Sequence, residues 1–112
     1  MKFSKIIQIV ILLIFHLQFC NAQTCNLKKG QEEFTKRIID IKDYIEKEKA
    51  IDVINYVNEL EKLTNIKSES DINYFGKMNP TKNDLIKWNE WYENKKEIVC
   101  WDDTNNRLFI KL

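Results

Sequence analysis

The sequence predicts a mainly α-helical domain: a helical hairpin, a third helix and a small C-terminal β-hairpin, with a small α+β fold as the alternative class. Three observations lead to this prediction. Two stretches carry apolar residues at helical spacing, and a third stretch begins with a capping box before an aromatic face. The segment 98–112 then contains two strand-forming runs around a polar turn.

The first 22 residues are expected to be a cleavable signal peptide and not part of this domain, which spans 23–112. A positive start is followed by an apolar run over 6–19, and Cys20 and Ala22 occupy the small-residue positions before the cleavage point. A run of about 14 residues is shorter than the ~20 that span a bilayer, so we expect no stable membrane insertion after cleavage. Lipidation at Cys20 is disfavoured because the preceding Phe19 is not small. The expected location is secreted or periplasmic.

The segment 31–63 has no glycine or proline and is predicted to form an antiparallel helical hairpin. Two apolar stripes carry this prediction: Phe34, Ile38, Ile41 and Ile45, and then Ala50, Val53, Ile54, Val57, Leu60 and Leu63. On one continuous helix the second stripe would be rotated by about a third of a turn from the first, so two helices fit better. The turn is placed at 46–49, which has no apolar residue, and residues 23–30 are interpreted as a polar lead that Gly30 ends.

A polar, irregular loop is predicted over 64–79. Tyr74 and Phe75 lie in it and are candidate partner-binding residues, although folding back onto the hairpin is the favoured interpretation. The third helix follows, because Thr81 and Asp84 form a capping box. Its predicted core face consists of Leu85, Trp88, Trp91 and Tyr92.

The C-terminal β-hairpin is predicted from strands at 98–101 and 108–112, joined by a turn at 102–106. A lone hairpin is marginal in water, so we expect it to pack on the helices. A disulfide between Cys25 and Cys100 would hold it beside the start of the first helix. These two cysteines remain after signal cleavage and form an even pair in an oxidising compartment. Two free thiols, with Cys100 as a nucleophile, are the rival interpretation.

Composition excludes several kinds of chemistry. The single histidine, His16, lies in the signal segment, so the mature domain has no histidine for catalysis or metal binding. Lys2 and Lys5 leave with that segment while all 17 acidic residues remain, so 18 basic residues become 16 and the net charge becomes −1. This balance gives no attraction to nucleic acid. No cofactor motif is present, and turn formation accounts for the acidic cluster at 102–106.

A calcium loop is matched only in part. Asp71, Asn73 and Gly76 occupy three of its positions, but Phe75 and Lys82 stand where oxygen ligands are required. No metal site is therefore expected.

Aromatic residues supply the remaining candidates. Trp88, Trp91 and Trp101 are candidate partner-binding residues and could stack on sugar rings, while core packing is the default interpretation because Trp88 and Trp91 share the stripe of Leu85. The many carboxylates include no singled-out acid–base pair.

Several segments resemble the C-terminal end of bacterial HEAT-like helical-repeat proteins, in which a Trp-x-x-Trp helix covers the last repeat. They are Leu60–Ile66, Asn79–Thr81, Trp88–Lys95 and Trp101–Asp102. Asn65 departs from the usual glycine, and the helical hairpin occurs only once. The resemblance implies a helix pair with a capping helix and a protein partner, and it supplies no catalytic residue.

Together these observations predict an exported, non-enzymatic protein-binding module, such as an inhibitor, an immunity-type protein or an accessory protein. The alternative is a small glycan-binding or carboxylate-dependent glycan-acting protein that uses the tryptophan cluster.

Overall fold

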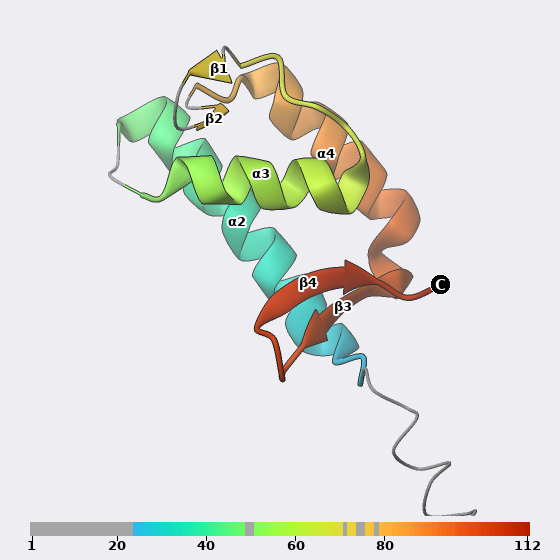
Figure 1. Ribbon diagram of the computed structural model, residues 1–112. Coiled ribbons are helices and arrows are strands. Elements are labelled where there is room, and N and C mark those ends of the chain that lie inside the picture. Colours follow the sequence, from blue (N-terminus) through green and yellow to red (C-terminus); the bar gives the residue numbers. More distant parts are fainter. Residues whose placement is uncertain (1–23, 49–50, 71, 74–75, 78) are drawn as a thin grey trace, which may run out of the picture.

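The computed structural model describes residues 24–48, 51–70, 72–73, 76–77 and 79–112 (Figure 1). Its elements are α2 (Leu27–Lys47), α3 (Val53–Thr64), β1 (Ile72–Asn73), β2 (Gly76–Lys77), α4 (Lys82–Lys95), the 3-10 helix η1 (Lys96–Ile98), β3 (Val99–Asp102) and β4 (Arg107–Ile110). The three α-helices and the C-terminal β-hairpin in this part of the chain confirm the predicted fold class. The expected signal segment 1–22 lies outside the described residues.

Helix α2 begins earlier than predicted. The Asn26 side chain accepts a hydrogen bond from the Lys29 backbone N–H at 3.1 Å and so caps a helix that starts at Leu27. Gly30 is buried inside this helix and does not end a polar lead. A Cβ atom at Gly30 would lie 2.4 Å from the Val99 carbonyl oxygen, so only glycine allows α2 to approach β3 this closely.

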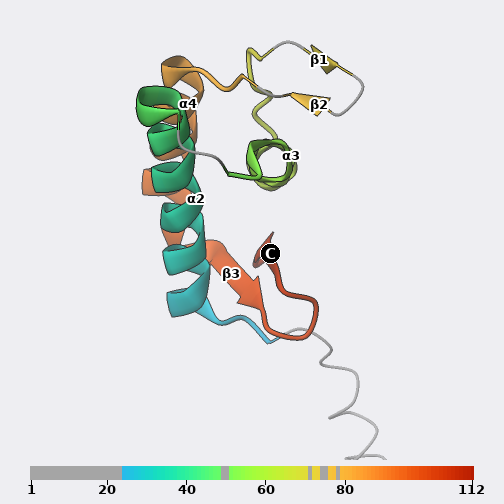
Figure 2. The same cartoon turned by 90° about the vertical axis from the view of Figure 1, so that its left-hand side faces the viewer.

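The break between the first two helices is confirmed. Helix α2 ends at Lys47, and Glu48 adopts a left-handed conformation with φ 52°, within the predicted turn at 46–49. The predicted antiparallel arrangement of these two helices is wrong, because α3 crosses α2 steeply: Figure 2 views α3 end-on while α2 lies in the plane of the picture. This steep crossing lets α3 pack against α2 and also against the β-hairpin.

Both predicted apolar stripes lie in one core. Its buried members are Phe34, Ile38, Ile41, Val53, Val57, Leu60, Leu63, Leu85, Trp88 and Val99. Phe34 stacks on Tyr92, with 4.5 Å between ring centroids, and so joins α2 to α4. The helices therefore enclose the core with the faces that the apolar spacing indicated, while Ala50 lies outside the described residues.

The capping box at the start of α4 is also confirmed. The Thr81 hydroxyl accepts from the Asp84 N–H at 3.1 Å, and the Thr81 N–H donates to the Asp84 carboxylate at 2.9 Å. Asp84 is buried and also accepts hydrogen bonds from the Ser68 hydroxyl and the Glu69 N–H. One carboxylate thus fixes both the start of α4 and the loop that precedes it.

The C-terminal hairpin is antiparallel, and its register runs from Val99 opposite Ile110 to Asp102 opposite Arg107. Its turn is fixed by Asp102, whose carboxylate accepts from the N–H groups of Thr104 and Asn105 at 3.0 and 3.2 Å. The predicted disulfide is present between Cys25 and Cys100, whose Cα atoms are 4.9 Å apart. It joins the residue before the Asn26 cap to the middle of β3.

Candidate protein-binding site

Hydrogen bonds define which side of each hairpin strand is open. Trp101 exchanges two backbone hydrogen bonds with Asn26, at 3.1 and 3.0 Å, so these groups of β3 point away from β4. The Lys111 N–H donates to the Ile98 carbonyl at 2.8 Å, so Ile98 and Lys111 form a hydrogen-bonded pair across the hairpin. The direction of the backbone N–H and C=O groups alternates from one residue of a strand to the next. Phe109 is therefore hydrogen-bonded to β3, while the backbone groups of Leu108 and Ile110 point away from it.

Leu108 and Ile110 consequently present their N–H and C=O groups at the outer edge of β4. No backbone or side-chain group of the described residues pairs with them there. The inner edge of β3, by contrast, is covered by Asn26 and the start of α2 (Figure 1). Unpaired strand edges of this kind can accept an additional strand.

A groove of about 530 Å³ lies between this strand and α3. Its walls are Glu59, Lys62 and Leu63 of α3, the four residues of β4, and Leu112. Leu108 and Ile110 pack against the core from this strand. An open edge and a groove with apolar walls are therefore adjacent.

Positive charge gathers around the edge. Arg107 and Lys111 alternate with half-buried Phe109 on the face opposite to Leu108 and Ile110, because side chains alternate along a strand. The Arg107 Nε lies 3.7 Å from the Asp102 carboxylate. Within the described part of the chain, neither Lys62 nor Lys111 lies in an ion pair with a carboxylate. The local charge is thus positive although the whole chain carries a net charge of only +1.

Arg37 fixes the α3 side of the groove. Its buried guanidinium donates to the Glu59 carboxylate at 2.5 Å and to the Glu33 carboxylate at 2.7 Å. Burial alone would lower the pKa of Arg37, but its hydrogen bonds and charge interactions with the two glutamates outweigh burial and raise the pKa. Arg37 is shared between Glu33 and Glu59, so these three side chains together carry a charge of −1, and the positive charge at the groove comes from Lys62, Arg107 and Lys111.

Two of the candidate partner-binding residues, Trp88 and Trp101, are buried. Trp88 is fully buried, and its indole N–H donates to the Ile66 carbonyl at 3.3 Å. Trp101 is 7% exposed, and the cationic groups of Lys29 and Arg37 lie 5.8 and 5.6 Å from its ring centroid. Both indoles belong to the interior of the fold, as the core-packing interpretation has it.

The other candidate residues are Trp91, Tyr74 and Phe75. Trp91 is half-buried against Phe34, with ring centroids 5.9 Å apart. Tyr74 and Phe75 lie outside the described residues. The open edge of β4 is not predictable from the sequence, because it depends on Asn26 pairing with the other side of β3.

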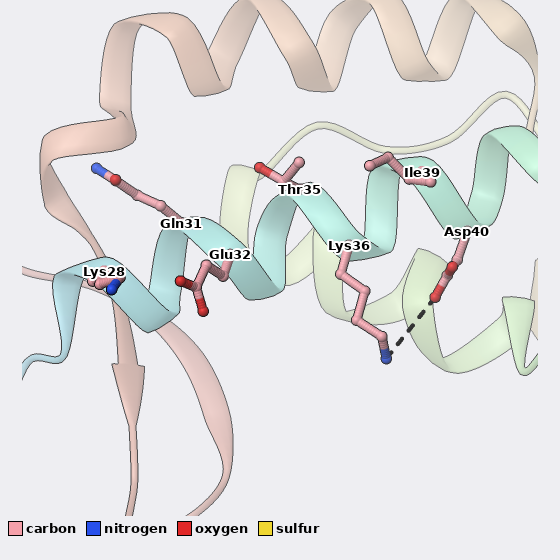
Figure 3. Close-up of a pocket in the computed structure, with 7 residues that line it drawn as sticks. All are labelled: Lys28, Gln31, Glu32, Thr35, Lys36, Ile39 and Asp40. Carbon is pink, nitrogen blue, oxygen red and sulfur yellow. Dashed lines mark ion pairs between the residues drawn. The ribbon is translucent and has the colours of Figure 1, made fainter.

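A second hollow runs along the outer surface of α2 and does not have the features of a site. Figure 3 shows seven side chains that fan out along this one helix: Lys28, Gln31, Glu32, Thr35, Lys36, Ile39 and Asp40. Lys36 and Asp40 form an exposed ion pair at 4.0 Å. No polar groups converge on a common point there, so the hollow lacks the convergent contacts of a ligand site.

The residues that the structure describes contain neither a metal-binding cluster nor a membrane-spanning helix. No cluster of three His, Cys, Asp or Glu side chains there is placed to hold a metal ion. None of the helices in that part of the chain has the length and apolar character needed to cross a bilayer.

Comparisons of the chain with protein-family models, curated proteins and solved structures return no match. The resemblance to the ends of helical-repeat proteins stays a prediction.

Proposed function

We propose that this domain is an exported, non-enzymatic protein-binding module whose binding site is the outer edge of β4 with the groove beside α3. The observation that carries the proposal is the outward direction of the Leu108 and Ile110 backbone groups next to apolar groove walls. Inhibitor, immunity-type and accessory proteins all fit this description.

Export is supported by the Cys25–Cys100 disulfide, which is compatible with an oxidising compartment. The glycan alternative loses its main support, because a stacking platform needs exposed rings and both Trp88 and Trp101 are buried.

Site-specific photo-crosslinking tests the proposal. A p-benzoylphenylalanine placed at Phe109 should give a discrete protein adduct in the exported fraction of the source cells. The same group at Glu90, an exposed residue of α4, is the matched control and should give none. Excess unlabelled protein should compete for the adduct, whereas a Lys62→Glu, Arg107→Glu variant should not. Equal adducts from both positions, or none from Phe109, would contradict the proposed site.

A further inference from the structure

We infer that the partner contributes an extended acidic segment that pairs with β4 as an additional strand. This inference rests on the proposed function and specifies the chemistry of the partner at the same site. It follows from three features of the edge: its backbone groups, its charges and its shape.

The backbone groups fix the register of the added strand. Leu108 and Ile110 each offer one outward N–H and one outward C=O, so each can exchange two hydrogen bonds with a residue opposite it. Those two partner residues are separated by one residue, which lies opposite Phe109 and points its own backbone groups away from β4. The pairing thus has an alternating pattern that a chemical probe can detect.

The side chains fix the composition of the added strand. Partner residues opposite Leu108 and Ile110 share their face of the sheet, which is the groove side, and should be apolar. Partner residues opposite Arg107 and Lys111 share the other face, where opposite charges stabilise a cross-strand pair. The pattern acidic, apolar, any residue, apolar, acidic therefore fits the edge.

A second copy of the chain fits less well. In the two-fold arrangement that pairs Leu108 of one copy with Ile110 of the other, Arg107 of each copy lies opposite Lys111 of the other. Like charges directly opposite each other destabilise a strand pair. The same cations that disfavour self-pairing favour an acidic partner.

The probe is the peptide acetyl-Thr-Glu-Val-Tyr-Val-Glu-Thr-amide, added to the oxidised protein and followed by amide hydrogen exchange and NMR. We expect the Leu108 and Ile110 amides to exchange rapidly without peptide and to be protected at least about tenfold at saturation. The Phe109 amide, which is bonded to β3, should already be protected. A peptide with Lys in place of both Glu should bind at least about tenfold more weakly.

N-methylation separates strand addition from other modes of binding. Methylation of both Val nitrogens, which would face β4, should abolish binding, whereas methylation of the Tyr nitrogen should leave it intact. An Arg107→Glu, Lys111→Glu variant should reverse the preference and select the Lys peptide.

Each alternative outcome is distinct. Strand addition would be overturned if the Val-methylated peptide bound as well as the unmethylated one. It would also be overturned if NMR chemical shifts of groove residues changed without protection of the Leu108 and Ile110 amides from exchange. Either result would leave a protein-binding groove. No peptide binding alongside a specific Phe109 adduct would reject the acidic strand and retain the proposed function. Protection that rises with protein concentration alone would identify a second copy as the occupant and overturn the inference.

Discussion

At the scale of single residues, Gly30 determines how closely the first helix approaches the sheet. The atoms nearest to a Cβ at this position all belong to the backbone of Val99 and Cys100, at 2.4 to 2.8 Å, and backbone cannot rotate away as a long side chain can. Local sequence does not reveal this role. Glycine is unfavourable inside a helix by propensity, so the sequence alone predicts that Gly30 ends a polar lead, whereas the contact that requires glycine comes from a strand about 70 residues later.

We expect Gly30→Ala to lower the free energy of unfolding by about 1–3 kcal/mol, because α2 and β3 must move apart. In an exposed helix the same change would stabilise the protein by about 0.5–1 kcal/mol through helix propensity. Urea unfolding followed by circular dichroism measures the difference. Thr35→Ala, on the exposed face of the same helix, is the control and should change stability by less than about 0.5 kcal/mol. A Gly30→Ala protein as stable as wild type would mean that the close approach is absent.

Asp102 gives a pH-dependent prediction at the same scale. A hydrogen bond from the Asn105 side chain, at 2.8 Å, is the main cause that lowers the pKa of Asp102, and burial opposes it. The N–H groups of Asn105 and Thr104 and the charge of Arg107 lower it further. A lowered pKa in the folded state means that the ionised form stabilises the turn. This stabilisation is complete above the unfolded-state pKa and is lost as pH falls through the folded-state pKa.

Asn105→Ala should therefore raise the pKa of Asp102 toward its ordinary value, as measured by NMR titration of its carboxyl carbon. The free energy of unfolding of this variant should also fall less than that of the wild type as the pH is lowered, because ionised Asp102 stabilises its turn less. Asn94→Ala, on the exposed surface of α4, serves as the control and should leave the Asp102 titration unchanged. If both variants titrate like wild type at Asp102, the Asn105 hydrogen bond is not the cause.

At the scale of elements, the start of α4 depends on Asp84. We expect Asp84→Ala to lower the free energy of unfolding by about 2–4 kcal/mol, because it removes a helix cap and the buried carboxylate that accepts hydrogen bonds from Ser68, Glu69 and Thr81. Amide exchange should accelerate first over the opening turn of α4. Asn83→Ala changes the adjacent exposed residue, whose side chain donates a hydrogen bond to the Glu69 carboxylate at 2.6 Å, and should cost less than about 0.5 kcal/mol. Equal losses in the two variants would refute this role of Asp84.

The elements that could be predicted are those whose cause is local. The capping box of α4 lies within four residues, and the stripes of α2 and α3 depend only on helical spacing. The earlier start of α2 also had a local signal, since Asn26 is a good N-cap, but Gly30 outweighed it. The crossing of α3 over α2 has no local cause, because it depends on α3 also packing against the C-terminal β-hairpin.

The candidate site was unpredictable for the same physical reason. Composition marks tryptophan as a binding residue, but Trp88 and Trp101 are the residues that a small core most needs to bury. The open edge of β4 follows from strand order: Asn26 occupies the other side of β3 and leaves β4 outermost. Strand order is a property of the assembled fold and not of any one segment.

At the scale of the whole molecule, the Cys25–Cys100 disulfide joins the two ends of the described fold. It closes a loop with a sequence separation of 75 beside the Asn26–Trp101 bridge, so it holds the inner edge of the sheet against the start of α2. Loop-closure entropy for such a separation is worth about 4 kcal/mol, a large share of the 5–15 kcal/mol typical of a domain.

A Cys25→Ala, Cys100→Ala variant should therefore lose about 3–5 kcal/mol of unfolding free energy in urea. Reduction of the wild-type protein should produce a loss of the same size, and the same reductant should leave the double variant unchanged, which separates the bridge from any general effect of the reagent. The loss arises because the unbridged chain has more unfolded conformations, so it should appear mainly as a lower midpoint with the folded spectrum retained in water. A double variant as stable as the oxidised protein would show that helix packing and the Asn26 bridge alone hold β3 in place.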